Sequence, residues 1–297
     1  MNFRALIGNV FNPSKTARRL QSEESRHAKR AYFHKYSHRP RLSFSATVFT
    51  IAIIFLFLPL VVLVVNSFNG SSGISWGGFS LRWYERLLQE KELWRAFRNS
   101  IFIALTSAVS AVIIGTLGAV GINWYRFKLR GYIQTISFLP MILPEIILGV
   151  SLSIFFAWLE IPLGLFTIYV AHTTFNIPFV FLMVMARLDE FDFSIIEAAS
   201  DLGASERQTL YKVILPICMP GIISGFLTAI TLSLEDFVIT FFVAGPGSST
   251  LPIFIYSAIT RKSGITPLIS ALSVVMIFGT VILCITLRRF LKYIAAK

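Results

Sequence analysis

The sequence predicts an all-α integral membrane protein with six transmembrane helices. The chain has 297 residues, of which 55% are apolar and only 14% are charged. Runs of about 20 or more nearly uncharged residues are long enough to cross a bilayer as helices. Six such runs follow one another along the chain, at 44–66, 99–124, 131–159, 164–186, 217–244 and 267–287.

The basic residues lie between these runs. A formal net charge of +12 would suit a protein that binds nucleic acid. However, Lys and Arg occupy the connecting segments and the ends of the apolar runs, so the charge belongs to loops. We therefore expect membrane lipid, and no nucleic acid, beside this chain.

The distribution of the basic residues also predicts an orientation. With the N-terminus inside the cell, the inner segments hold twenty Lys and Arg and the outer segments hold seven. Basic residues accumulate on the cytoplasmic side of membrane proteins, so both termini are predicted to be cytoplasmic. The first apolar run begins after about 43 hydrophilic residues, too late for a cleaved signal peptide, and is expected to remain as an anchor.

The chain is expected to divide into three parts. Residues 1–43 form a basic cytoplasmic arm, which would attract anionic lipid head groups. Residues 44–290 hold the spans, and residues 291–297 form a cytoplasmic tail. Cys218 and Cys284 both fall in apolar runs, where we expect small buried side chains and neither a disulfide nor a metal site.

Two further segments carry signals of local structure, one for a surface helix and one for a broken span. In the connection 67–98, apolar side chains recur at helical spacing after a Gly/Ser turn cluster, which suits either the outer membrane surface or an external protein partner. The third run contains "FLPMILPEIILG", in which Pro140 and Pro144 each remove a backbone donor and kink the helix. Broken helices at membrane depth often line cavities.

The cytoplasmic connection 187–216 differs from the others because it is capped and acidic. S-x-x-E at 194–197 and S-x-x-Q at 205–208 fit capping boxes, and Gly203 stands where a glycine would reverse the chain after a helix. We expect two short helices, the second ended by Pro216. Six acids against three bases give a local net charge of −3, which suits a protein partner better than an anionic membrane surface.

Three acidic residues lie within the apolar runs: Glu145 in the third, and Glu235 with Asp236 in the fifth. An ionised carboxylate at the bilayer centre costs roughly 2.5–3.5 kcal/mol, so such residues usually face a cavity or a partner. We interpret them as a path for a cation, flanked by aromatic rings that can contact an amine: Trp158, Phe237 and Tyr256. The alternative is that Glu235 and Asp236 mark the outer interface and that the aromatic rings face lipid.

The stretch "EAASDLGASERQTLYKVILP" at 197–216 resembles the EAA loop of ATP-binding cassette (ABC) importer permeases. The resemblance implies a type I ABC importer permease fold over the spans. It also implies that the loop docks in a groove of a cytoplasmic ATPase, with these residues at the coupling site: Glu197, Ala198, Ala199, Asp201 and Gly203. Glu197 is in addition expected to cap its own helix.

Other stretches resemble the second permease subunit of spermidine/putrescine importers. They are "LPEIILGVSL", "HTTFNIPFVFLMVMARL", "LSLEDFVITFFVAGPGSSTLPIFIYS" and "PLISALSVVM". That family carries an acid after the proline of the third span and an acidic pair in the fifth. Here Glu145 replaces the commoner Asp, and Glu235 stands where Asp-Asp is usual. His172, in the second stretch, is by itself expected to be a helix-packing residue.

The resemblance implies transport without catalysis by this chain. It implies a bacterial inner-membrane location, a homologous second permease, two ATPase subunits and a periplasmic polyamine-binding protein. The chain has no G-x-x-x-x-G-K-[ST] motif, so ATP and Mg are expected on the partner ATPase. The alternatives are another cargo, such as ferric ion, thiamine or an organophosphonate, or a stand-alone channel or ion-driven carrier, for which an acidic docking loop has no use.

Overall fold

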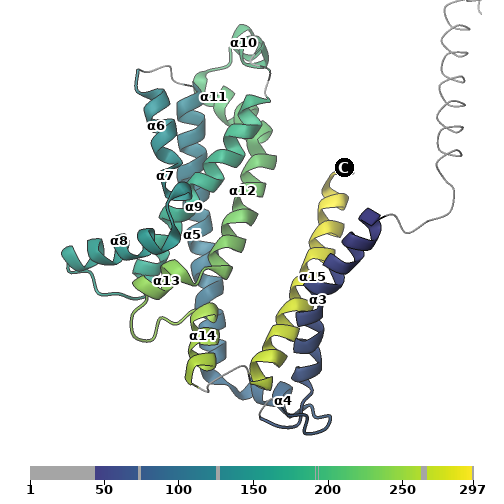
Figure 1. Ribbon diagram of the computed structural model, residues 1–297. Helices are drawn as coiled ribbons and strands as arrows, with labels where there is room; N and C mark the ends of the chain where they lie inside the picture. The colour runs from purple at the N-terminus through teal and green to yellow at the C-terminus, as the bar shows by residue number, and fades with distance from the viewer. Residues whose placement is uncertain are drawn as a thin grey trace, which may run out of the picture. The chain divides into compact units, whose positions relative to one another are not determined.

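The computed structural model describes residues 44–72, 75–124, 128–190, 192, 194–261 and 266–295 (Figure 1). The predicted basic arm at 1–43 lies outside the described residues. The chain divides into two units, one ending at Val62 and the other beginning at Leu63. In the first unit, the described residues belong to α3 (Phe44–Ser67), whose side chains are almost all apolar and exposed, as a helix in contact with lipid requires.

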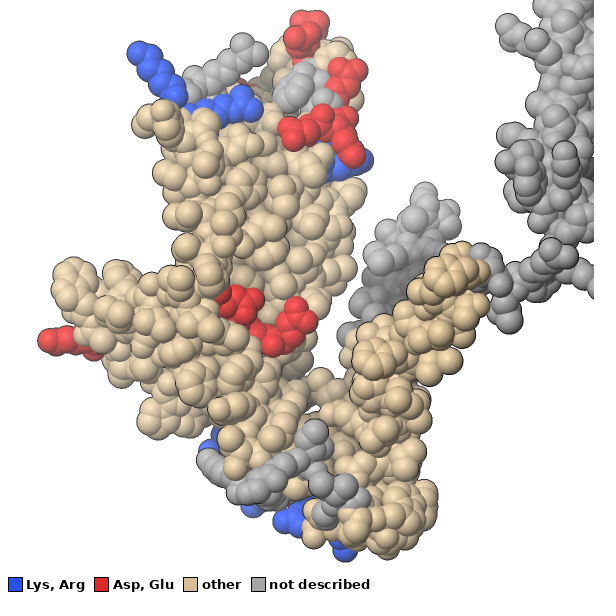
Figure 2. Space-filling model, viewed as in Figure 1, with Lys and Arg blue, Asp and Glu red and all other residues tan. Residues whose placement is uncertain are grey.

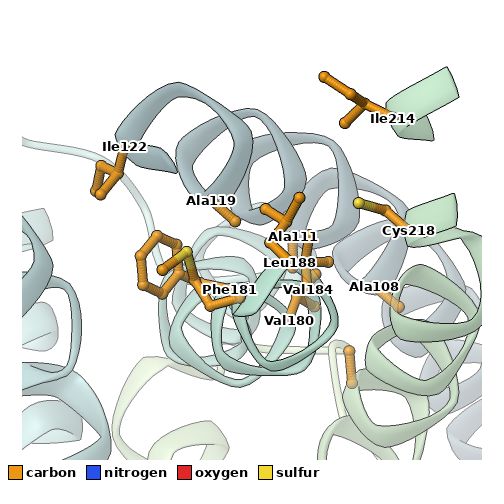
Figure 3. Packing of buried hydrophobic residues seen from close by; sticks show 12 residues of the cluster. Ala108, Ala111, Ala119, Ile122, Val180, Phe181, Val184, Leu188, Ile214 and Cys218 are labelled. Atoms are coloured by element: carbon orange, nitrogen blue, oxygen red, sulfur yellow. The ribbon is translucent and has the colours of Figure 1, made fainter. Parts of the chain in front are cut away.

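The centre of the second unit is a bundle of three long helices. They are α5 (Lys91–Trp124), α9 (Leu165–Asp189) and α12 (Leu215–Glu235). Small and branched side chains fill the space between them (Figure 3), among them Ala108, Ala111, Ala119, Val180, Val184 and Cys218. Cys218 is buried, as expected, whereas the side chain of Cys284 lies outside the described part.

Glycines bring these three helices close to one another. A methyl group added at Gly221 of α12 would lie 2.8 Å from the carbonyl oxygen of Met183, and one at Gly225 would lie 3.1 Å from the Cα of Val180. From the opposite side, a methyl group at Gly115 of α5 would lie 3.0 Å from the Cβ of Val180. Small residues at such contacts let helix backbones approach closely in a membrane.

The third apolar run is broken, as its prolines predict, and is not one straight span. It forms α6 (Arg130–Ser137), α7 (Leu139–Ile142) and α8 (Glu145–Trp158). The axis bends by 102° between α7 and α8. Leu143 and Pro144 are both extended there, with ψ of 139° and 132°. Leu143 precedes a proline, whose ring drives the preceding residue out of the helical region.

The fifth apolar run is also broken, which the sequence reasoning did not predict. Helix α12 ends at Glu235, Asp236 is extended with ψ of 123°, and α13 (Val238–Val243) follows. Helices α8 and α13 pack against each other and against the start of α9. They share a second core, which includes Ile103, Leu148, Phe156, Ile168, Ile239 and Val243.

A third cluster joins the remaining helices: α4 (Arg82–Gln89), α14 (Leu251–Arg261) and α15 (Pro267–Ala295). Helix α4 lies in the connection that predicted a helix, and Trp83 and Leu87 form its buried face. The indole Nε1–H of Trp83 donates to the carbonyl of Asn69 at 2.7 Å, so this tryptophan ties the helix to the preceding turn.

The connection 187–216 forms the predicted helix pair with two differences. Helix α10 (Ser194–Asp201) is followed by Gly203 at φ +78°, and its end is closed by hydrogen bonds from Gly203 N–H to Ser200 and from Ala204 N–H to Ala199. The capping box at 205–208 is confirmed, because Ser205 and Gln208 bond each other's backbone N–H groups at the start of α11 (Glu206–Thr209).

The differences concern the first capping box and Pro216. At α10, Ser194 is already helical, and the carboxylate of Asp192 accepts its backbone N–H at 3.0 Å, so Asp192 takes the capping role expected of Ser194. Pro216 does not end the second helix. A π-helical turn, η1 (Leu210–Ile214), precedes it, and the widened turn lets the proline ring fit within the first turn of α12.

The described residues are almost entirely helical, which confirms the predicted all-α membrane fold. Four of the described helices are long and apolar enough to cross a membrane, or up to five if the bent pair around Leu143 counts as one span. The number six stays a prediction.

Candidate functional site

The three acids of the apolar runs lie around one cavity of about 320 Å³. Figure 2 shows acidic side chains gathered there, away from the charged side chains at either end of the second unit. The cavity is lined by Glu145, Phe175, Leu232, Glu235, Asp236, Phe237 and Val238. In the described part of the chain, no three His, Cys, Asp or Glu side chains gather closely enough to hold a metal ion.

Each acid stands at the end of a helix. Glu145 is the first residue of α8, Glu235 is the last of α12, and Asp236 lies between α12 and α13. The N-terminus of a helix carries a partial positive charge and its C-terminus a partial negative charge. Glu145 therefore offsets the positive end of α8 and Asp236 that of α13, whereas Glu235 adds to the negative end of α12. Among the described residues, the cavity is thus lined by three acidic side chains and by no basic one.

Glu145 and Glu235 are both exposed, and neither forms an ion pair with a described residue. Asp236 differs, because its side chain is only 3% exposed. Both of its carboxylate oxygens accept hydrogen bonds from the first turn of α13: Oδ1 from the Ile239 N–H at 3.2 Å, and Oδ2 from the Thr240 N–H at 2.9 Å. The Thr240 hydroxyl donates to Oδ2 as well, at 2.6 Å.

His172 of α9 is the remaining partner of Asp236, and the sequence reasoning did not foresee this. Its Nε2 lies 3.1 Å from Oδ2 of Asp236 and 2.8 Å from the Thr240 hydroxyl, and its Nδ1 lies 2.6 Å from the Ser233 hydroxyl. The residue is 1% exposed, so it is a packing residue as expected, but one with every ring nitrogen bonded. The signal that could have indicated this contact is an imidazole within an apolar run, because such a group needs a polar partner.

Of the three candidate aromatic residues, only Phe237 lines the cavity. The Tyr256 ring of α14 packs on the Phe237 ring with centroids 4.8 Å apart, so it supports Phe237 without lining the cavity itself. Trp158 is the last residue of α8, is 77% exposed and does not line the cavity.

The predicted coupling residues lie together on α10 and the turn that follows it. None of the residues of α10 is buried, and Glu197, Ala198 and Asp201 are exposed. Leu202, which follows them, is 89% exposed, so an apolar side chain stands at this surface beside the acidic ones. Figure 2 shows acidic side chains crowded over this end. Hydrogen bonds from Ser194 hold the pKa of Asp192 below its usual value, so this cap stays ionised.

The sequence matches the family described as "Binding-protein-dependent transport system inner membrane component" over residues 111–297. The spermidine/putrescine transport system permease protein PotC of Escherichia coli strain K12 is 39% identical over 232 residues, covering 78% of this chain and 87% of that protein. PotC of Haemophilus influenzae is 41% identical over 224 residues, covering 75% and 86%. The putrescine transport system permease protein PotI of Escherichia coli strain K12 is 40% identical over 235 residues, covering 76% and 83%.

Solved structures share the fold. A bacterial ABC transporter involved in the import of the acidic polysaccharide alginate matches with a TM-score of 0.66 at 17% identity, covering 83% of this chain and 94% of that chain. The MetNI methionine ABC transporter in an inward-facing conformation matches with a TM-score of 0.56 at 22% identity, covering 68% and 95%. At these identities the likeness concerns the fold, and the cargo has to be argued from the cavity.

Proposed function

Because the chain belongs to the family of binding-protein-dependent transport system inner membrane components, we propose that it carries a polyamine, spermidine or putrescine, through an ABC importer. The permease role follows from the family, in which the ATPase is a separate subunit. The choice of cargo is the proposal, and the negative cavity is the observation that supports it.

The cavity fits a cationic cargo. It brings Glu145, Glu235 and Asp236 together from two broken spans, and none of the described residues that line it is Lys or Arg. Broken helices in transporters place helix ends at the substrate site, and the cavity has this arrangement. Phe237, supported by Tyr256, adds an aromatic face that can contact an alkylammonium group.

The proposed assembly includes three further kinds of protein. A homologous second permease would close the other side of the cavity, two ATPases would bind ATP and Mg, and an external binding protein would deliver the polyamine. The exposed helix pair at 194–209 would dock on an ATPase, with both chain termini on the same, cytoplasmic side. Closure of the ATPases would tilt the spans and turn the cavity from outward to inward facing.

The test is ATP-driven uptake by the complete complex in liposomes. Spermidine, putrescine, a neutral amino acid and ferric ion are supplied in parallel, with ATP hydrolysis followed in the same vesicles. We expect polyamine-dependent uptake and stimulated hydrolysis, both lost in the triple variant Glu145→Gln, Glu235→Gln, Asp236→Asn. Undiminished polyamine uptake by the triple variant, or uptake by this chain alone without ATP, would overturn the proposal.

A further inference from the structure

We infer that Asp236 is a positioning residue held by His172, and that Glu145 and Glu235 make the direct contacts to the cargo. This inference rests on the proposed function, since it divides the three cavity carboxylates into two roles. The division comes from the hydrogen bonds that each carboxylate already makes and from its exposure.

The carboxylate of Asp236 is fully engaged. An ionised carboxylate offers about four acceptor positions on its two oxygens. Oδ1 accepts the Ile239 N–H, and Oδ2 accepts the Thr240 N–H, the Thr240 hydroxyl and the imidazole of His172. Four donors already contact this carboxylate, and its side chain is only 3% exposed, so it is far less available to an ammonium group than the exposed carboxylates of Glu145 and Glu235.

The imidazole of His172 joins three side chains: those of Asp236, Thr240 and Ser233. If Nε2 carries a proton, that proton is shared between the Thr240 hydroxyl oxygen at 2.8 Å and Oδ2 of Asp236 at 3.1 Å, while Nδ1 lies 2.6 Å from the Ser233 hydroxyl. The Ser233 oxygen in turn accepts from the Ser107 hydroxyl at 3.5 Å. The imidazole therefore links a chain of side chains from α5 through α12 and α9 to the start of α13.

This network holds the break between α12 and α13. The backbone N–H of Asp236 closes the last turn of α12 on the Leu232 carbonyl, while its side chain caps the first turn of α13. The bend that follows Glu235 is thereby fixed, and the exposed Glu235 side chain is left at the cavity wall without a hydrogen-bond partner among the described residues. Glu145, exposed at the start of α8, is left in the same condition.

The experiment separates apparent affinity from turnover in the reconstituted complex, with spermidine as the probe. Glu145→Gln and Glu235→Gln are each expected to raise KM about tenfold, the loss that follows removal of one charged contact. Asp236→Asn keeps an acceptor for α13 but weakens the cap, so we expect Vmax to fall about fivefold with KM changed less than about twofold. Glu160→Gln, an exposed acid beyond α8 that does not line the cavity, is the matched control.

His172 provides the second readout. His172→Leu removes the donor to Asp236 and is expected to lower Vmax about tenfold at an unchanged KM. His172→Gln keeps an N–H donor and should recover at least half of that loss. Size-exclusion elution of each purified complex excludes loss of assembly as the cause.

The outcomes distinguish the two proposals. If Asp236→Asn raises KM as much as Glu235→Gln does, Asp236 is a cargo contact and the inference is wrong, while the proposed function stands. If His172→Gln is no better than His172→Leu, the positioning role of His172 is wrong. If none of the carboxylate variants changes KM or Vmax, the polyamine path itself is wrong.

Discussion

At the scale of single residues, the chemistry of the cavity depends on three carboxylates and on the histidine that contacts one of them. Carboxylates in apolar runs are rare enough to be noticed, and the cavity brings Glu145, Glu235 and Asp236 together. The contact of His172 with Asp236 is not apparent in the sequence, because the two residues are sixty-four positions apart and only the packing of α9 against the α12–α13 break makes them neighbours. Trp158 shares a helix with Glu145 but lies at its far end.

Gly203 is the residue whose conformation most directly fixes the docking helix pair. Its φ of +78° is costly for any side chain with a Cβ, by about 1–2 kcal/mol. Gly203→Ala is therefore expected to speed amide hydrogen exchange in residues 194–209 of the intact complex about five- to thirtyfold. Gly121→Ala, where an added methyl group meets nothing within 4 Å, is the control. Equal exchange in both variants would contradict this role.

At the scale of helices, proline and glycine residues predicted the helix breaks that they themselves cause. Breaks with another cause were not predictable from the sequence. Pro140 and Pro144 predict the bend before α8, and Gly203 predicts the turn after α10. The break at Asp236 lies in "LSLEDFVITFF", which contains no proline or glycine. Tertiary hydrogen bonds to Asp236 stabilise it, so periodicity and breaker residues could not reveal it. The π turn at 210–214 is not apparent in the sequence either, because a proline after a helical stretch usually indicates the end of the helix.

Helix packing supplies a prediction about the bundle. An added methyl group at Gly221 lies 2.8 Å from the Met183 carbonyl oxygen, so Gly221→Ala has to push α12 away from α9. Overpacking of this kind costs about 1–3 kcal/mol, and we expect a lower aggregation temperature for the detergent-solubilised complex. Gly279→Ala, in open space on α15, should leave that temperature unchanged or raise it. The packing argument fails if the two variants behave alike.

At the scale of the whole molecule, the all-helical membrane fold and the permease family were predictable, because hydropathy and one specific loop carry them. The number of spans and the positions of their breaks were less predictable. Hydropathy indicates only that residues 131–159 and 217–244 are apolar, whereas in the structure the helix is interrupted within both segments. Which end faces the cytoplasm is still predicted from the distribution of Lys and Arg alone.

Docking on the ATPase gives the prediction at this scale. Leu202 is 89% exposed beside α10, and a charge there would be buried against the proposed partner. We expect Leu202→Glu to reduce co-purification of the ATPase on the order of tenfold or more, because an unpaired carboxylate is costly to bury in an interface. Leu88→Glu changes a leucine that is 72% exposed on α4, at the opposite end of the second unit (Figure 1), and should retain the ATPase. Loss of the ATPase from both variants would argue against docking at α10.

The pairing of α8 with α13 has a consequence for how the chain is made. Helix α8 buries Leu148, Gly149 and Phe156, and its main packing partner is α13. That partner is synthesised only after α9 and α12, so α8 enters the membrane without the surface on which it will rest. Its 14 residues span about 21 Å, less than the bilayer core, and it cannot settle as a crossing in the meantime. The cavity between these helices is therefore completed late, once α13 has left the ribosome, entered the membrane and reached α8.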